Sequence, residues 1–201
     1  MAWDTARTKR LLLEAARAEF AEYGIAGGRV DRIAAKAGVN KERIYGYFGN
    51  KEKLFNVVLA SALVELAETV RPGEGPIGEY VGRIYDFHRK DPAFLRLLMF
   101  EALYYGDSLV EENPGRLEWY TNASESLAEA RGCTLEEAGH LLITIIGLGA
   151  WPTAMPQLAR LAMGPQAHEE DAQQALRGFL VDFAERGAHR PPHRPTPTET
   201  P

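Results

Sequence analysis

The sequence predicts an all-α protein. Apolar residues recur at helical spacing in nearly every segment, and no strand-like alternation persists. With 45% hydrophobic residues among 201, the chain can bury a full core. We expect a three-helix N-terminal domain over residues 1–50 and a larger helical domain over 51–187. Residues 188–201 hold five prolines and little that is apolar, and this composition predicts a disordered tail.

The first half of the chain holds the clearest helix boundaries. A helix is expected from about Asp4 to Tyr23, ended by Gly24. Asn50 is placed to cap a long helix that stops at Arg71-Pro72-Gly73. This long helix would join the two domains as a lever.

The later helices have recognisable start signals: Asp91-Pro92, Asn113-Pro114, and the capping-box pair Thr134 and Glu137. The run Phe94 to Tyr104 is apolar almost all round, which predicts a central buried helix. Pro152 and Pro156 should kink or interrupt the helix that follows Thr134. A last helix is expected from about Gln166 to Arg186.

The stretch from Val30 to Phe48 predicts two short helices joined by a tight turn. Gly38 can take the left-handed conformation that ends the first helix, and Asn40 supplies an acceptor for the start of the second. Ile44 is four residues from Phe48, so the two share an inward face. Two helices in this arrangement place the second one in the DNA major groove. The side chains left pointing elsewhere are Lys41, Glu42, Arg43 and Tyr47.

At these residues the chain resembles the TetR family of bacterial transcription regulators. LLLEAARAEFAEYG at Leu11–Gly24 is similar to that family's first helix, and IAAKAGVNKERIYGYFGNKEKLF at Ile33–Phe55 to its DNA-reading helices. The resemblance implies that the side chains of Tyr45, Tyr47 and Lys51 meet the phosphate backbone. It also implies that the early part of the reading helix, Lys41, Glu42 and Arg43, faces base edges.

Two positions depart from the family's pattern. Gly46 stands where a bulkier, frequently aromatic residue is common, which leaves one DNA contact open. Gly28 and Arg29 stand where Thr or Ser commonly opens the second helix. Glycine caps almost as well as a hydroxyl residue, and Arg29 could contact a phosphate instead.

The distribution of charge favours the same interpretation. The net charge is −5, but residues 1–53 hold 11 Lys and Arg against 7 Asp and Glu, a balance of +4, and the remainder is at −9. A basic end on an acidic body suits phosphate binding by that end. An uneven surface charge that serves no partner would give the same count. The charge balance therefore supports DNA binding only in combination with the two short helices.

A DNA-binding protein with one such helix gains affinity for double-stranded DNA by forming a dimer, which presents two of these helices. The late helices expose more apolar surface than one small domain normally does, and the resemblance implies a homodimer through the last two helices. The expected interface residues are Leu141, Leu142, Ile145, Ile146, Gly149, Leu176, Phe179 and Phe183. Core positions of a single chain would show the same pattern.

The middle of the chain is rich in aromatic residues and methionine, which suits a mostly apolar pocket. The resemblance implies a small-molecule effector inside this domain, and a hydrophobic or aromatic one is expected. The candidate contacts are Tyr85, His88, Met99, Tyr104 and Trp119. Aromatic residues at helical spacing are also ordinary core residues.

Other function classes find little support. No HExxH, phosphate loop or nucleophile elbow is present, so we expect no enzyme, no cofactor and no metal site. Cys133 is the only cysteine, which excludes a disulfide framework within the chain. The charged N-terminus and short apolar runs predict a cytoplasmic protein without a signal peptide or membrane contact. An all-helical interaction module or an enzyme without DNA binding is the alternative.

Overall fold

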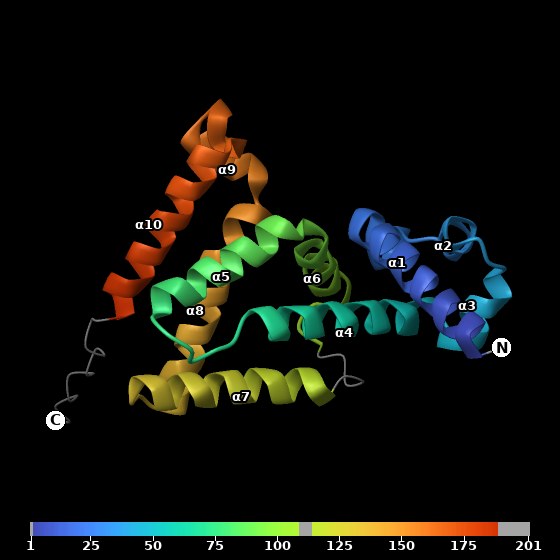
Figure 1. The fold of residues 1–201 in the computed structure, drawn as a ribbon, viewed down its shortest axis with the longest axis horizontal. Coiled ribbons are helices and arrows are strands. Elements are labelled where there is room, and N and C mark those ends of the chain that lie inside the picture. Colours follow the sequence, from blue (N-terminus) through green and yellow to red (C-terminus); the bar gives the residue numbers. More distant parts are fainter. Residues whose placement is uncertain (1, 109–113, 189–201) are drawn as a thin grey trace, which may run out of the picture.

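The computed structural model describes residues 2–108 and 114–188, and all regular structure among them is helical (Figure 1). The helices are α1 (Ala2–Gly27), α2 (Val30–Ala37), α3 (Lys41–Phe48), α4 (Lys51–Thr69), α5 (Ile77–Lys90), α6 (Pro92–Tyr105), α7 (Pro114–Arg131), α8 (Leu135–Ala154), α9 (Pro156–Met163), the 3-10 helix η1 (Pro165–His168) and α10 (Glu170–Ala188). The all-α prediction is confirmed. The predicted cap Asn113 and positions 189–201 of the predicted tail lie outside the described residues.

Helices α1 to α3 form a head at one end of the molecule, and α4 runs from it into the body, with α6 above it and α7 below it in this view (Figure 1). The core of the head is shared with α4, where Phe55 meets Phe20 of α1 edge to face at 5.4 Å between ring centroids. Phe94 and Leu97 of α6 are buried in the same core. The head is therefore packed directly on α4 and α6 of the body.

Two glycines set the end of α1 by close packing. The helical conformation breaks at Gly24 as predicted, with a φ of 69° and a ψ of −176°, and a further short turn runs from there to Gly27. A Cβ on Gly24 would lie 2.7 Å from a ring carbon of Phe100 in α6, and one on Gly28 equally close to Phe20. Gly28 thus serves packing rather than capping. The N-cap residue of α2 is Arg29, whose side chain makes no cap hydrogen bond.

The body is built around α5, which packs between α8 and α10. These helices approach closely at glycines: a Cβ on Gly149 would lie 2.5 Å from Ile84, and one on Gly78 would lie 2.5 Å from the carbonyl oxygen of Val181. Helix α7 covers α8. The body has a second core, and the two cores meet at Leu66 and Phe87.

Some helix boundaries match the sequence, and others differ for local reasons. The capping box of Thr134 and Glu137 is present, and Asn50 caps α4 as predicted. Asp91 does not cap α6, because its carboxylate pairs with Arg17 instead. Pro156 interrupts α8 as predicted and begins α9, whereas the last long helix starts at Glu170 after a separate 3-10 turn.

The sequence predicted that α6 is buried on all sides, and this prediction is wrong. Phe94 and Leu97 face the core, but Leu103 is 79% exposed and Tyr104 is exposed beside it. The helix lies at the surface of the body and buries one side. Among the described residues, no single helix is both long and apolar enough to cross a bilayer.

Candidate DNA interface, effector cavity and apolar face

The turn between α2 and α3 has the geometry that its sequence predicted. Gly38 is left-handed, at a φ of 66° and a ψ of 31°, and its N–H donates to the carbonyl of Ala35. The side chain of Asn40 accepts from the N–H of Glu42 and starts α3. Ile44 is 1% exposed and anchors α3 on the head. The anchored side of α3 leaves its opposite side free for a partner.

That free side carries the predicted base-reading residues. Lys41, Glu42, Arg43 and Tyr45 are all exposed, and Tyr47 is half-buried. Lys41 forms an ion pair with Asp31 at 3.3 Å, with both side chains exposed, and the hydrogen bond to Asp31 raises the lysine pKa. An exposed pair of this kind is weak, so Lys41 can leave Asp31 for DNA. An added Cβ at Gly46 would meet nothing within 4 Å, so this departure from the family pattern leaves open surface.

Lys51 and Arg29, the two predicted phosphate contacts outside α3, differ in their surroundings. The Nζ of Lys51 lies 3.5 Å from the carbonyl oxygens of Ala26 and Gly28, beside the start of α2. The side chain of Arg29 is exposed, while its backbone N–H donates to Glu19 at 2.8 Å. Both cations lie next to the same loop.

Glu19 holds α1 and α2 together, a role that the sequence did not reveal. It is 8% exposed and accepts from the backbone of Arg29 and from Arg32 Nε at 2.7 Å. Burial tends to raise the pKa of Glu19, but the hydrogen bonds from Arg32 and Arg29 hold it below its usual value. The carboxylate is therefore charged at neutral pH and fixes the orientation of α2.

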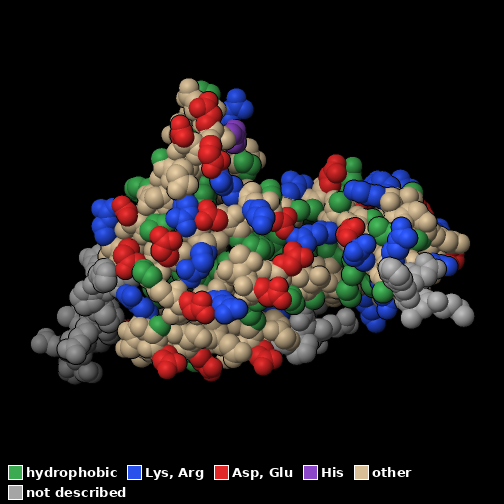
Figure 2. Space-filling model, in the orientation of Figure 1, with side chains coloured by type: hydrophobic (Ala, Val, Ile, Leu, Met, Phe, Trp, Pro, Cys, Tyr) green, Lys and Arg blue, Asp and Glu red, His purple; other side chains and the backbone are tan. Residues whose placement is uncertain are grey.

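The basic residues of the head fall into two groups. Four are paired with carboxylates: Arg10, Arg17, Arg32 and Lys41. Within the part of the chain that the structure describes, the others have no such partner: Arg7, Lys9, Arg29, Lys36, Arg43, Lys51 and Lys53. Figure 2 shows Lys and Arg side chains gathered over the head and acidic ones along the lower edge of the body. The head is therefore an electropositive surface suited to phosphate.

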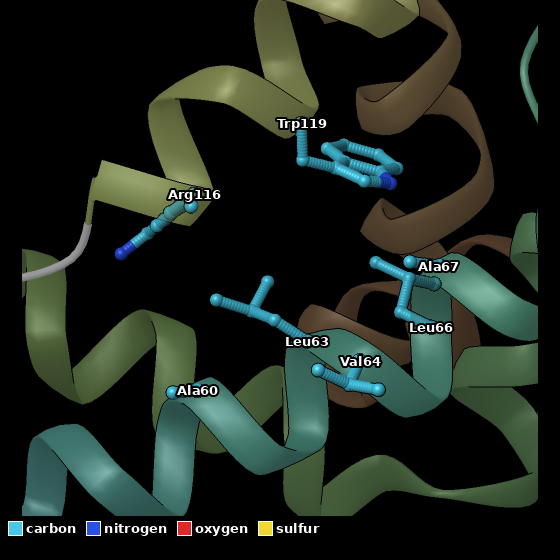
Figure 3. A pocket seen from close by; sticks show the side chains of 8 residues that line it. Ala60, Leu63, Val64, Leu66, Ala67, Arg116 and Trp119 are labelled. Carbon is cyan, nitrogen blue, oxygen red and sulfur yellow. The ribbon is translucent and has the colours of Figure 1, made fainter.

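A cavity of about 200 Å³ lies between α4 and α7 (Figure 3). Its wall is apolar apart from one arginine and consists of Ala60, Leu63, Val64, Leu66, Ala67, Gly115, Arg116 and Trp119. Arg116 forms an ion pair at 2.7 Å with Glu101 of α6, which is nearly buried. A lining that is apolar apart from one charged group is of the kind that binds small, mostly apolar molecules.

Only one of the five predicted effector contacts lines this cavity. Trp119 does so, whereas Tyr85 and His88 are buried in the core, and Met99 and Tyr104 are exposed on α6. The structure therefore does not bring the five together. The helical spacing on α5 reflects core packing, as the sequence allowed. The missed signal was a second apolar stripe on α4, formed by Ala60, Leu63, Val64 and Ala67 at spacings of three and four.

His88 is a core residue with a pH dependence of its own. Its ring stacks on Phe94 and its Nδ1 has no hydrogen-bond partner among the described residues. Burial lowers the His88 pKa to about 4, against the attraction of Asp91. In the unfolded chain this histidine takes up a proton near pH 6.5. The free energy of unfolding is therefore at its full value above pH 6.5 and decreases as the pH falls towards 4, because only the unfolded chain gains the proton in that range.

We expect the free energy of unfolding to be roughly 2 kcal/mol lower at pH 5 than at pH 7 because of His88. Urea denaturation at the two pH values measures this loss. His88→Phe, which keeps an aromatic ring against Phe94, should remove that part of the pH dependence. The exposed His140 gives the control: His140→Phe should leave the pH dependence intact. Equal pH dependence in the wild type and His88→Phe would contradict this prediction.

The predicted interface residues of α8 and α10 divide into three groups by burial. Leu142, Ile145 and Gly149 are buried against neighbouring helices of the same chain, so they are core residues and offer no surface to a partner. Phe179 and Phe183 are 60% and 53% exposed, with their rings stacked at 6.0 Å. The three others, Leu141, Ile146 and Leu176, are half-buried.

Further apolar residues that were not predicted for the interface are exposed on α8: Ile143 is 71% exposed, and Leu135 and Trp151 are exposed as well. The spacing of eight residues points these three side chains in different directions around the helix. We call the stacked pair Phe179 and Phe183 of α10 the apolar face. Helix α10 lies at the end of the molecule opposite the head (Figure 1). Exposed aromatic side chains of this kind are enriched at protein interfaces.

Two family models match the chain, one for each part of the fold. Residues 12–58 match the model described as bacterial regulatory proteins, tetR family, and residues 76–186 match a tetracyclin repressor-like C-terminal domain. The second match alone covers more than half of the chain. The first contains α2, α3 and the start of α4.

Relatives with known names and solved structures that resemble the chain are also transcriptional regulators. The chain is 37% identical over 165 residues to the HTH-type transcriptional repressor SCO4008 of Streptomyces coelicolor, covering 80% of this chain and 86% of the relative. It is 36% identical over 107 residues to the repressor NicS of Pseudomonas putida, about half of each chain. The crystal structure of the putative transcriptional regulator SCO4942 from Streptomyces coelicolor matches with a TM-score of 0.76 at 28% identity, covering 92% of this chain and 99% of that one.

The fold and the exposed reading helix define a DNA-binding transcriptional regulator rather than an enzyme. The chain belongs to the TetR family.

Proposed function

We propose that the chain is a ligand-responsive repressor that binds a palindromic operator as a homodimer and is released by a small, mostly apolar effector. The observation that carries the proposal is the placement of Arg17. This residue of α1 donates from Nη1 to both oxygens of Glu65 in α4, at 3.0 and 2.9 Å, and pairs with Asp91 at the junction of α5 and α6. One side chain thus ties the head to both helices on which it rests.

The cavity lies on the same turns of α4 as this contact. Leu63, Val64 and Leu66 line the cavity, and Glu65 between them holds Arg17. An effector that fits better when α4 is displaced from α7 would favour that displaced state. The displacement would carry Glu65 away from Arg17 and change the orientation of the head.

A second connection runs through α6. Arg116 at the cavity pairs with Glu101, and one turn earlier Arg96 donates to the α1 carbonyls of Ala21 and Glu22. The cavity therefore contacts α4 directly and is linked to α6 through the Arg116–Glu101 ion pair. A dimer repressor needs a fixed distance between its two heads, so a small rotation of each head is enough to lose the operator.

The effector part of the proposal is tested with Trp119 as the reporter. In a variant with Phe in place of Trp3 and Trp151, compounds from a panel of small aromatic and aliphatic molecules should change Trp119 emission and lower operator affinity at the same concentrations. Ala67→Leu, which fills the cavity, should abolish both effects. Compounds that change Trp119 emission but leave operator affinity unchanged would refute the coupling.

The DNA part predicts different roles for Arg43 and Lys51. Arg43 on the exposed side of α3 is proposed to contact a guanine, with Glu42 accepting from a cytosine. Arg43→Ala should therefore cost about 1–3 kcal/mol on the operator and much less on unrelated duplexes. Lys51→Ala, a phosphate contact, should weaken both kinds of duplex alike. Titration of each variant with operator and scrambled duplexes measures the difference, and equal loss of specificity in the two variants would contradict it.

A further inference from the structure

The first turns of α1 lie directly beside the reading helix. Thr8 and Leu12 are buried, so this side of α1 faces the interior of the head. The neighbours of Thr8 in the chain, Arg7 and Lys9, lie about 100° to either side of it on the helix. They therefore emerge on opposite flanks of α1.

Each of the two cations reaches a different part of α3. Arg7 and Arg43 line one groove, of about 400 Å³, together with Asn40 at the start of α3. On the other flank, the Nζ of Lys9 lies 5.3 Å from the centre of the Tyr47 ring, in the last turn of α3. The two cations thus bracket the reading helix at its two ends.

Neither cation is engaged by a carboxylate of the head. Arg7 and Lys9 have no ion-pair partner in the portion of the chain that the structure describes, unlike Arg10, which pairs with Glu14 at 3.7 Å. The contact of Lys9 with the half-buried Tyr47 ring is worth on the order of 1 kcal/mol. Both charges can therefore turn to an external anion at little cost.

We propose that Arg7 and Lys9 bind backbone phosphates on the strands that border the major groove occupied by α3. The inference rests on the proposed DNA-binding function. A helix in a groove about 12 Å wide has a row of phosphates along either edge, and α1 places one cation near each end of that helix. The start of α1 is then part of the DNA interface and sets the register of α3 in the groove.

The test is the salt dependence of binding by the full chain. Wild type, Arg7→Ala, Lys9→Ala and the double variant are titrated with a random-sequence duplex of about three helical turns and with an operator selected from a random pool. The salt concentration is varied between about 50 and about 200 mM. Each single substitution should lower the slope of log K against log salt by about one, and the double variant by about two. Affinity should fall by the same factor on both duplexes, because phosphates carry no sequence information.

Two controls separate a phosphate contact from a folding defect. Arg160→Ala removes an exposed charge from α9, in the body and away from the head, and should leave the slope at the wild-type value. Arg7→Lys keeps the charge and should keep the slope. Wild-type slopes in Arg7→Ala and Lys9→Ala would overturn the inference while leaving the proposed function intact. Absence of duplex binding by the wild-type chain would instead overturn the proposed function.

Discussion

Replacing Phe179 and Phe183 together by aspartate is expected to give a monomer that binds the operator at least about 100-fold more weakly than the wild type. Both rings are more than half exposed and stack on one another on α10. If a second copy covers them, each ring buries an aromatic surface of about 150–250 Å². Two carboxylates in that position would have to be desolvated, and the second reading head would be lost with the partner.

Sedimentation at micromolar concentration and operator titration measure the two effects together. Leu103→Asp is the matched control, because Leu103 is 79% exposed on α6, outside the apolar face. It should change neither the mass nor the affinity. A wild-type chain that sediments as a monomer, or a double variant that stays dimeric, would contradict the assignment of the interface.

Leu12→Ala is expected to lower the free energy of unfolding by about 2–5 kcal/mol. Leu12 is fully buried in the head core, where its removal leaves a cavity between α1 and the helices it packs on. This is a large part of the total stability of an ordinary domain. Operator affinity should fall as well, because the orientation of α3 depends on the same core.

The same substitution at an exposed position provides the comparison. Leu117 in α7 is 66% exposed, and Leu117→Ala should change the unfolding free energy by less than about 0.5 kcal/mol. Urea denaturation of the two variants measures the difference. Similar losses in both would mean that Leu12 is not a core residue of the folded head.

The parts of the fold predicted well were those determined by short-range interactions. Gly38, Asn40 and Ile44 act within a few residues of one another, so their spacing defined the turn and the docking side of α3. The same holds for the capping box at Thr134. Periodicity also gave the existence and approximate length of most helices.

Features that depend on distant partners were not predicted. Gly28 was interpreted as a capping residue, but its close contact with the Phe20 ring determines its role. Asp91 had the position of a cap, and Arg17, 74 residues away, takes its carboxylate. Nothing local in the sequence distinguishes these cases.

Periodicity shows that a helix has an apolar side but not what covers it. Leu142 and Ile145 are covered by their own chain, while Ile143 between them is exposed. The aromatic spacing on α5 predicted a pocket at Tyr85 and His88, where the structure has core, and the cavity lies instead against α4. Which side of a helix faces a neighbour is decided by tertiary packing.

If two copies of this chain read a palindrome through α3, the purified protein should select that palindrome from a random pool of duplexes, and footprinting of the enriched sequence should show it. We expect a near-palindrome with half-sites about one helical turn apart, centred about 34 Å from each other. The Phe179→Asp, Phe183→Asp variant should not select it. Enrichment of no sequence, or of a single unrepeated half-site, by the wild-type protein would contradict this expectation.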